Sequence, residues 1–172
     1  DQHYFVGNSL GLMPSAAKAM IAEVLRDWAQ HAVEGHFAVD NPWMHYHGLV
    51  REPLAELVGA LPVEVVAMNT LSVNLHLMMA SFYRPTPTRF KILMESDAFP
   101  SDRYAVASQT VFHGHDPEKA VLNWQPRPGE TLLRMEDLED LMAREGESIA
   151  LILLGGVNYY TGQAFDLKKI TA

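Results

Sequence analysis

Three short segments carry polar or aromatic side chains in patterns that suit the binding of an anionic or planar ligand. The first is Asn69-Thr70-Leu71-Ser72, at the start of a predicted helix. Its hydroxyl groups, together with the free backbone amides of a helix start, could hold a dianionic phosphate. Thr and Ser are also ordinary helix N-caps, so the residues alone leave a purely structural role open.

The second segment follows a predicted strand and ends in Phe99-Pro100-Ser101-Asp102. A Phe ring can stack on a planar ring system, and a helix start again offers N–H donors to an anion. The alternative is that Ser101 or Asp102 caps the helix while Phe99 acts as a hydrophobic staple. Both interpretations stay open at this point.

The third segment, residues 155–162, reads Gly-Gly-Val-Asn-Tyr-Tyr-Thr-Gly and follows another predicted strand. Glycines at a strand end permit a close approach of the backbone to a ligand, and the Asn, Tyr and Thr side chains offer hydrogen bonds. A tight turn would account for the same residues.

These segments are positioned by an alternation of short apolar runs with helical stretches. The runs predict strands at 65–68, 90–94, 120–124 and 149–154, with helices at 72–83, 101–112 and 136–145 between them. Such alternation is typical of βαβ units on a buried, mostly parallel sheet, so the predicted fold class is α/β. In open sheets of this kind, ligands bind beyond the carboxyl ends of the strands, where the polar segments lie.

The first third of the chain is predicted to be helical. Apolar residues recur at helical spacing from Pro14 towards Gly35 and again over 49–58, before Gly59. We therefore predict an N-terminal helical segment at 1–61, followed by an α/β domain at 62–172.

Composition argues against several classes of partner. Thirteen Lys and Arg against 21 Asp and Glu give a net charge of -8, which disfavours nonspecific attraction to nucleic acid and to anionic membranes. No apolar run approaches the roughly 20 residues that span a bilayer. The chain contains no cysteine, which fits a cytoplasmic location and excludes a thiolate nucleophile in this segment.

The eight histidines do not predict a metal site. The pairs His45 with His47 and His113 with His115 each supply two ligands at most, and no neighbouring carboxylate cluster completes a site. We expect no bound metal.

Three motifs taken together resemble the kynureninase family over essentially the whole chain. They are Gly-Asn-Ser-Leu-Gly at 7–11, Phe-Pro-Ser-Asp at 99–102 and Tyr-Tyr-Thr-Gly-Gln at 159–163. The resemblance implies an aspartate aminotransferase-like fold, pyridoxal 5'-phosphate (PLP) as cofactor, and a homodimer. It also implies hydrolytic Cβ–Cγ cleavage of L-kynurenine or 3-hydroxy-L-kynurenine to an anthranilate and L-alanine, in tryptophan catabolism and NAD biosynthesis.

The same resemblance assigns roles to individual residues. Substrate contacts are expected from Ser9 and from His36, which stands in a Gly-His pair. Many relatives carry Ser where Gly155 stands, so a hydroxyl contact to the cofactor would be lost here or made by the backbone. The expected cofactor contacts are Leu71, Ser72, Phe99, Pro100, Ser101, Asp102 and Gly155.

The lysine that forms the Schiff base with PLP in this family lies beyond Ala172, and no lysine of this chain stands in the matching Tyr-Lys context. The resemblance is thus to the N-terminal part of the enzyme. Two alternatives remain: another PLP enzyme of the same fold, such as a cysteine desulfurase relative, and a catalytically inactive fragment that serves only as a binding or interaction module.

Overall fold

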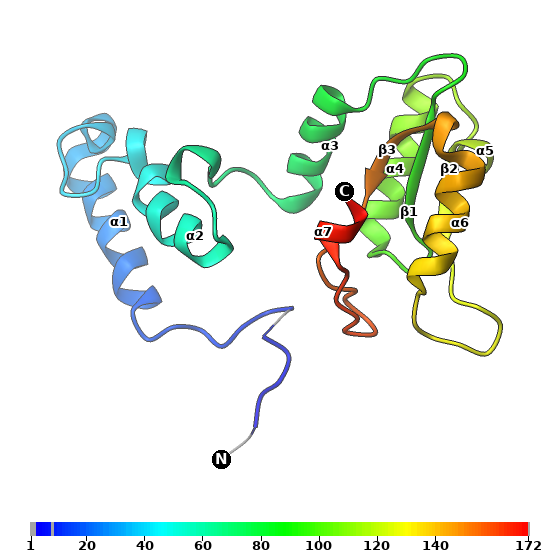
Figure 1. Cartoon of the computed structure of the whole chain (residues 1–172). Helices are drawn as coiled ribbons and strands as arrows, with labels where there is room; N and C mark the ends of the chain where they lie inside the picture. The colour runs from blue at the N-terminus through cyan, green and yellow to red at the C-terminus, as the bar shows by residue number, and fades with distance from the viewer. Residues whose placement is uncertain (1–2, 8, 172) are drawn as a thin grey trace. The chain divides into compact units, whose positions relative to one another are not determined.

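The computed structural model describes residues 3–7 and 9–171 (Figure 1). Asn8 of the Gly-Asn-Ser-Leu-Gly motif lies outside the described residues. The chain forms two compact units, Asp1–Met68 and Asn69–Ala172, and each is described by itself. The sequence-based domain limits at 61 and 62 stay a prediction.

The first unit consists of helices and connecting turns. Gly35 is buried because the Trp43 ring lies directly against its Cα, and the Asn41 amide donates to the Glu23 carboxylate at 3.2 Å. Gly59 ends a helix in the left-handed conformation, with φ of 69°. The elements are α1 (Ala17–His31), η1 (Ala32–His36), η2 (Trp43–Val50), α2 (Arg51–Val58) and η3 (Pro62–Glu64).

The strand predicted at 65–68 is wrong. The Val65 amide donates to the Pro62 carbonyl in a turn, and in the described part of the chain residues 65–68 pair with no strand. An extended apolar run becomes a strand only when a neighbouring strand accepts its backbone hydrogen bonds.

The second unit is built on a parallel sheet of three strands in the order β2-β1-β3. Glu95, the last residue of the central strand, lies opposite Trp124, and Met94 lies opposite Leu153. The strands are β1 (Lys91–Glu95), β2 (Val121–Trp124) and β3 (Ile149–Leu153). The α/β class predicted from the alternation is confirmed.

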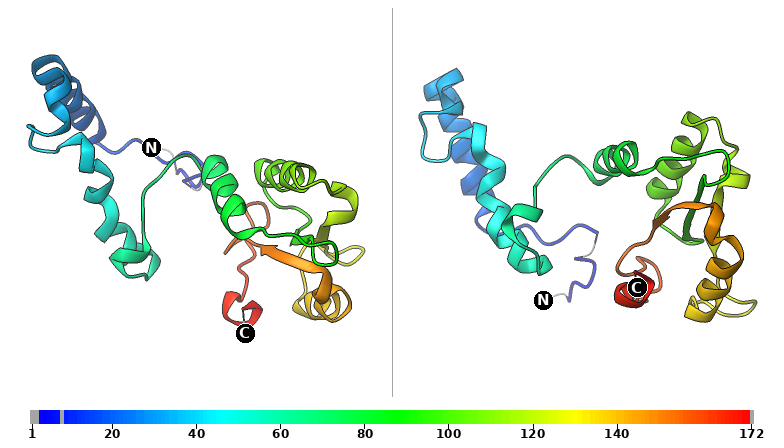
Figure 2. Two further views of the ribbon diagram at one scale, coloured as in Figure 1. Left: turned by 90° about the horizontal axis from the view of Figure 1, so that it is seen from above. Right: turned by 45° about the horizontal axis from the view of Figure 1, so that its top comes forward.

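Helices cover both faces of this sheet, as the view from above shows (Figure 2). α3 and α4 pack together, with 2.9 Å between a ring nitrogen of His76 and the side-chain amide of Gln109, while α6 covers the other face. The helices of the unit are α3 (Leu71–Phe82), α4 (Pro100–Phe112), α5 (Pro117–Ala120), α6 (Met135–Glu145), η4 (Gly146–Ser148) and α7 (Leu167–Ile170). The predicted helices at 72–83, 101–112 and 136–145 are therefore confirmed.

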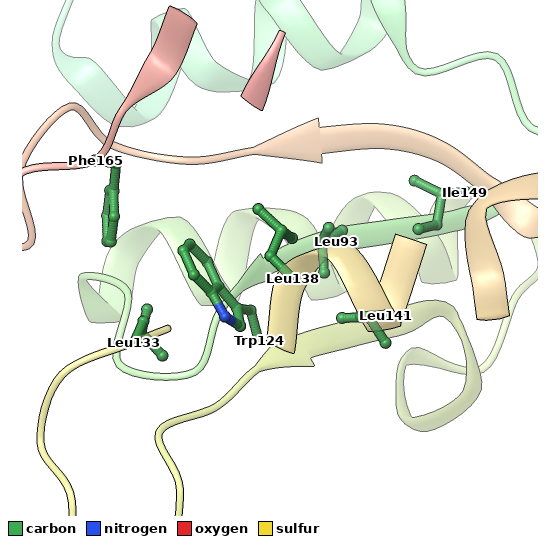
Figure 3. Close-up of a cluster of buried hydrophobic side chains, with 7 residues drawn as sticks. All are labelled: Leu93, Trp124, Leu133, Leu138, Leu141, Ile149 and Phe165. Carbon is green, nitrogen blue, oxygen red and sulfur yellow. The ribbon is translucent and has the colours of Figure 1, made fainter. Parts of the chain in front are cut away.

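Alternation along β1 divides the core into two clusters. Ile92 and Met94 point to the face covered by α3 and α4, where they meet Met79, Tyr83 and Val106. Leu93 points to the opposite face. Figure 3 shows the cluster there, with the Trp124 and Phe165 rings 5.4 Å apart between centroids; its members are Leu93, Trp124, Leu133, Leu138, Leu141, Ile149 and Phe165.

None of the helices in the described part of the chain combines the length and the hydropathy needed to cross a bilayer.

Candidate functional site

Two of the three polar segments meet at one edge of the sheet. Because the strands are parallel, their carboxyl ends lie together, and the loops after β1 and β3 leave from that edge. Figure 1 shows the start of α4 and the loop after β3 at the same end of the second unit. The sheet thus brings residues 96–102 and 155–163 side by side.

None of the polar side chains at the start of α4 caps the helix. Phe99 is the N-cap residue, Pro100 is the first helical residue, and no side chain caps the helix. The Asp102 amide donates to the Phe99 carbonyl at 2.9 Å, while the Ser101 hydroxyl lies 3.4 Å from the Asp102 carboxylate. The alternative in which Ser101 or Asp102 caps the helix is wrong, because Pro100 is the first helical residue and the N-cap is Phe99, two residues before Ser101.

The start of α3 is similar. Thr70 is the N-cap residue but its side chain makes no capping hydrogen bond, Leu71 is exposed, and Ser72 is half-buried in the first turn. At the other end of α3, the Tyr83 hydroxyl donates to the Phe90 carbonyl at 2.6 Å, just before β1 begins. The last turn of α3 therefore lies at the amino end of β1, and its first turn points away from that end.

The loop after β3 folds back on itself. Val157 and Ala164 form an antiparallel bridge, and Gly162 adopts φ of 72°, a conformation that favours glycine at the turn. Gly155 is exposed, and a Cβ added there would stand 3.3 Å from the Val157 carbonyl oxygen, a close fit. A serine at position 155 would thus require a small shift of the loop.

An aromatic pair joins the two loops. The Phe99 and Tyr159 rings meet edge to face with 5.1 Å between centroids and 77° between planes. Phe99 is 48% exposed, so part of its ring remains open to a ligand. Edge-to-face packing of this kind fixes the orientation of a ring that would otherwise be mobile.

A buried polar pair lies directly beneath these loops. Glu95 is 5% exposed and Asn158 is 4% exposed, and the Asn158 amide donates to the Glu95 carboxylate at 3.2 Å. Burial raises the pKa of Glu95, the hydrogen bond from Asn158 lowers it, and the negative charges of Asp97 and Asp102 raise it further, so that the pKa is raised on balance. Glu95 was not predicted as part of the site. Asn158 was expected to offer a hydrogen bond to a ligand, whereas its side chain donates to Glu95, a contact that spans 63 positions of the chain.

A hollow of about 610 Å³ opens beside the loops. Of the predicted site residues only Pro100 lines it, so the hollow adjoins the predicted cofactor contacts rather than enclosing them. Its polar and aromatic walls come from the loops after all three strands and from the first turn of α4. The lining residues are Asp97, Ala98, Pro100, Arg103, Tyr104, Pro126, Glu130, Thr131, Tyr159, Tyr160 and Thr161.

The two predicted substrate residues lie in the first unit. Ser9 is exposed, and its amide donates to the Val6 carbonyl at 3.1 Å in a turn that the Tyr4 hydroxyl also supports by donating to the Leu10 carbonyl. The exposed His36 ring meets the edge of Trp43 at 5.3 Å. The buried indole N–H of Trp43 has no hydrogen-bond partner among the described residues.

Two lysines of the second unit, Lys91 in β1 and Lys169 in α7, form ion pairs. The Lys91 ammonium lies 2.7 Å from the Glu145 carboxylate at the amino end of β1, which is the edge opposite the two loops. Lys169 pairs with Glu139 at 2.6 Å. Within residues 3–7 and 9–171, no three His, Asp or Glu side chains gather in a group that could hold a metal ion.

Comparison with known proteins supplies close relatives for nearly all of this chain. It is 62% identical over 168 residues to a kynureninase of Myxococcus xanthus and 59% identical over 168 residues to one of Koribacter versatilis, matches that cover 98% of this chain. A kynureninase of Nematostella vectensis is 53% identical over 172 residues, the whole of this chain. No family model matches. The chain spans 39%, 40% and 37% of the length of these three relatives.

Proposed function

We propose that this chain forms part of a kynureninase, which cleaves the Cβ–Cγ bond of L-kynurenine or 3-hydroxy-L-kynurenine with water to give an anthranilate and L-alanine. The observation that carries the proposal is identity of 53% to 62% to proteins named kynureninase over nearly every residue of the chain. Identity at that level over both units supports a shared activity and not only a shared fold.

We assign the PLP contacts to the starts of α3 and α4 and to the loop after β3. Leu71 and Ser72 would offer backbone and hydroxyl donors to the phosphate, and the half-exposed Phe99 ring would face the flat pyridine ring. Three observations fit such a ligand: two helix starts without side-chain caps, a ring fixed by Tyr159, and an exposed glycine backbone at Gly155. Ser101 and Asp102 complete the proposed set.

When bound, PLP would supply an electron sink for negative charge at the substrate Cα. The described residues would bind and orient the cofactor and shield one side of it from water. No lysine of this chain stands in the Tyr-Lys context expected of the Schiff-base lysine, and Lys91 is paired with Glu145 at the opposite edge of the sheet.

Substrate recognition is assigned to Ser9 and His36. A hydroxyl and an imidazole can both bond the carboxylate, amino or ring substituents of a kynurenine. Support comes from the neighbourhood of His36, where the indole N–H of Trp43 is a buried donor that no described residue satisfies. A buried donor without a partner costs free energy, which a ligand oxygen would recover.

A homodimer in the cytoplasm completes the proposal. Exposed apolar side chains on α1, namely Ile21, Leu25 and Trp28, follow one another at helical spacing and would be covered in an assembly.

The test is PLP binding and anthranilate release by the purified protein, with its intact mass determined in the same sample. A mass well above 19.2 kDa, the visible absorbance of bound PLP, and anthranilate formed from L-kynurenine but no product from cysteine would support the proposal. A protein that binds PLP and acts on cysteine instead would contradict it in favour of the desulfurase-like alternative. A protein of 19.2 kDa that neither binds PLP nor cleaves kynurenine would favour an interaction module.

A further inference from the structure

The side chain of Asn158 uses its hydrogen-bonding capacity on two different loops. Its carbonyl oxygen accepts from the Tyr160 amide at 2.9 Å, the Thr161 amide at 2.8 Å and the Thr161 hydroxyl at 3.1 Å. These bonds close the loop after β3 around the side chain. Asn158 is therefore the internal support of the loop that carries Tyr159.

The amide end of the same side chain reaches the central strand. It donates to the Glu95 carboxylate at 3.2 Å and, at 3.4 Å, to the backbone carbonyl of Asp97. Glu95 ends β1, and Asp97 lies two residues before Phe99. A single buried amide thus connects the segment leading into α4 with the loop after β3.

The residues held in this way are those whose rings meet at the site. Tyr159 directly follows Asn158, and its ring fixes Phe99 at 5.1 Å. Burial of a carboxylate is costly, and an apolar pair of similar volume often stabilises a protein to the same extent. We therefore look for the role of the buried Glu95–Asn158 contact in positioning the two loops and not in stability.

We infer that Glu95 and Asn158 form a positioning pair that sets the Phe99 and Tyr159 rings for the cofactor. This inference rests on the proposed function. Neither residue is assigned a contact with the cofactor. Asn158 donates a hydrogen bond to Glu95, and this bond holds the two loops in a fixed position relative to each other.

The direction of the bond can be reversed by substitution. Asn158→Asp places two carboxylates about 3.2 Å apart in a buried site, where both cannot remain charged without separating. Adding Glu95→Gln supplies an amide that donates to the carboxylate introduced at position 158, while the other oxygen of that carboxylate still accepts from Tyr160 and Thr161. Glu95→Gln alone keeps an oxygen that accepts from Asn158.

The test compares PLP affinity and the urea midpoint of unfolding for the two single variants and the double variant. We expect Asn158→Asp to weaken PLP binding about tenfold and to lower the midpoint, and Glu95→Gln to change PLP affinity less than about threefold. The double variant should recover most of both losses. Recovery will be partial, because a carboxylate at position 158 cannot donate to the Asp97 carbonyl.

Glu145→Gln is the matched control, since it removes a carboxylate bonded to the other end of the same strand. It should leave PLP affinity unchanged. If the double variant has the same PLP affinity and urea midpoint as Asn158→Asp, the proposed pairing of Glu95 with Asn158 is wrong. Recovery of the midpoint with equal PLP affinity in all variants would show a purely structural contact and overturn the positioning role.

Absence of PLP binding by the unaltered protein would instead contradict the proposed function, while the unfolding midpoints would still decide whether the pair exists.

Discussion

Phe99 is the residue whose environment most directly supports a planar ligand. The ring packs against Tyr159 in a T-shaped pair and remains 48% exposed at the start of α4. Because Phe99 precedes Pro100, its backbone is restricted to the non-helical conformation that the structure shows.

Replacement of this ring should weaken cofactor binding. An aromatic contact is worth about 0.5–1.5 kcal/mol beyond its buried area, so Phe99→Ala should raise the Kd for PLP roughly two- to tenfold. Phe112→Ala is the control, because Phe112 ends the same helix at the opposite end and is 81% exposed. Equal PLP affinity of the two variants, measured by fluorescence titration, would remove Phe99 from the site.

Glu95 should impose a pH dependence on stability. Its pKa is raised in the folded protein, chiefly by burial, so the folded state holds the proton more tightly than the unfolded state. Stability should therefore fall as the pH rises from the ordinary carboxyl pKa through the folded value. Glu95→Gln removes this loss.

The measurement is the free energy of unfolding of both proteins between about pH 4 and pH 8. The free energy of unfolding of Glu95→Gln should exceed that of the unaltered protein by an amount that grows with pH. A constant difference across this range would mean that burial does not perturb Glu95, and a difference that shrinks with pH would reverse the assigned direction.

At the scale of elements, the turn between α1 and α2 depends on the absence of a side chain at Gly35. A Cβ there would approach the Trp43 ring to 2.5 Å, and the ring in turn meets His36. The contact ties η1 to η2, and so ties the surroundings of a proposed substrate residue to one indole ring.

Gly35→Ala should destabilise the protein by about 1–3 kcal/mol, because the Trp43 ring must shift out of a packed position. Gly48→Ala is a matched control within η2, since nothing lies within 4 Å of the added Cβ. Urea unfolding followed by tryptophan fluorescence measures both. Equal stability of the two variants would show that Trp43 moves without cost.

The strands and helices of the second unit could be predicted from local sequence. The absence of a strand at 65–68 could not. Alternating apolar runs locate β1, β2 and β3 within a residue or two, because burial on both faces selects continuous apolar side chains. Residues 65–68 are also apolar, but a strand is defined by its neighbour, and no described segment pairs with them. Local composition carries no information about such a partner.

The candidate site was likewise predictable in part from local sequence and in part only from the fold. The polar segments were located from their types and from the rule for parallel sheets, yet Pro100 moved the helix start away from Ser101 and Asp102. Glu95 was missed because an acidic residue at a strand end is usually solvated. Asn158 was expected to face a ligand, and only the fold shows that it is buried against Glu95.

At the largest scale, both units expose apolar side chains. On α1, Ile21, Leu25 and Trp28 are exposed, and α3 and α4 expose Leu77, Phe82 and Phe112. The three residues of α1 recur at helical spacing, and contiguous exposed apolar patches mark contact surfaces in folded proteins.

The 172-residue polypeptide should therefore associate as its concentration rises, which sedimentation velocity measures directly. Ile21→Lys together with Leu25→Lys should reduce association, because the charges would have to be buried. Ala22→Lys adds a single positive charge on α1 outside the apolar stripe and should have little effect. A monomer at all concentrations would contradict a contact role for α1.

The strand order β2-β1-β3 also sets when the site can form. The central strand gains its second neighbour only from residues 149–153, and the Arg89 guanidinium bonds the Ile149 carbonyl across 60 positions. During synthesis, the edge that carries Phe99 stays incomplete until β3 has left the ribosome, and long-range parallel pairing of this kind is slow to close. This edge of the sheet is thus completed only after α3, α4 and α6, which precede β3 in the chain, have had time to form.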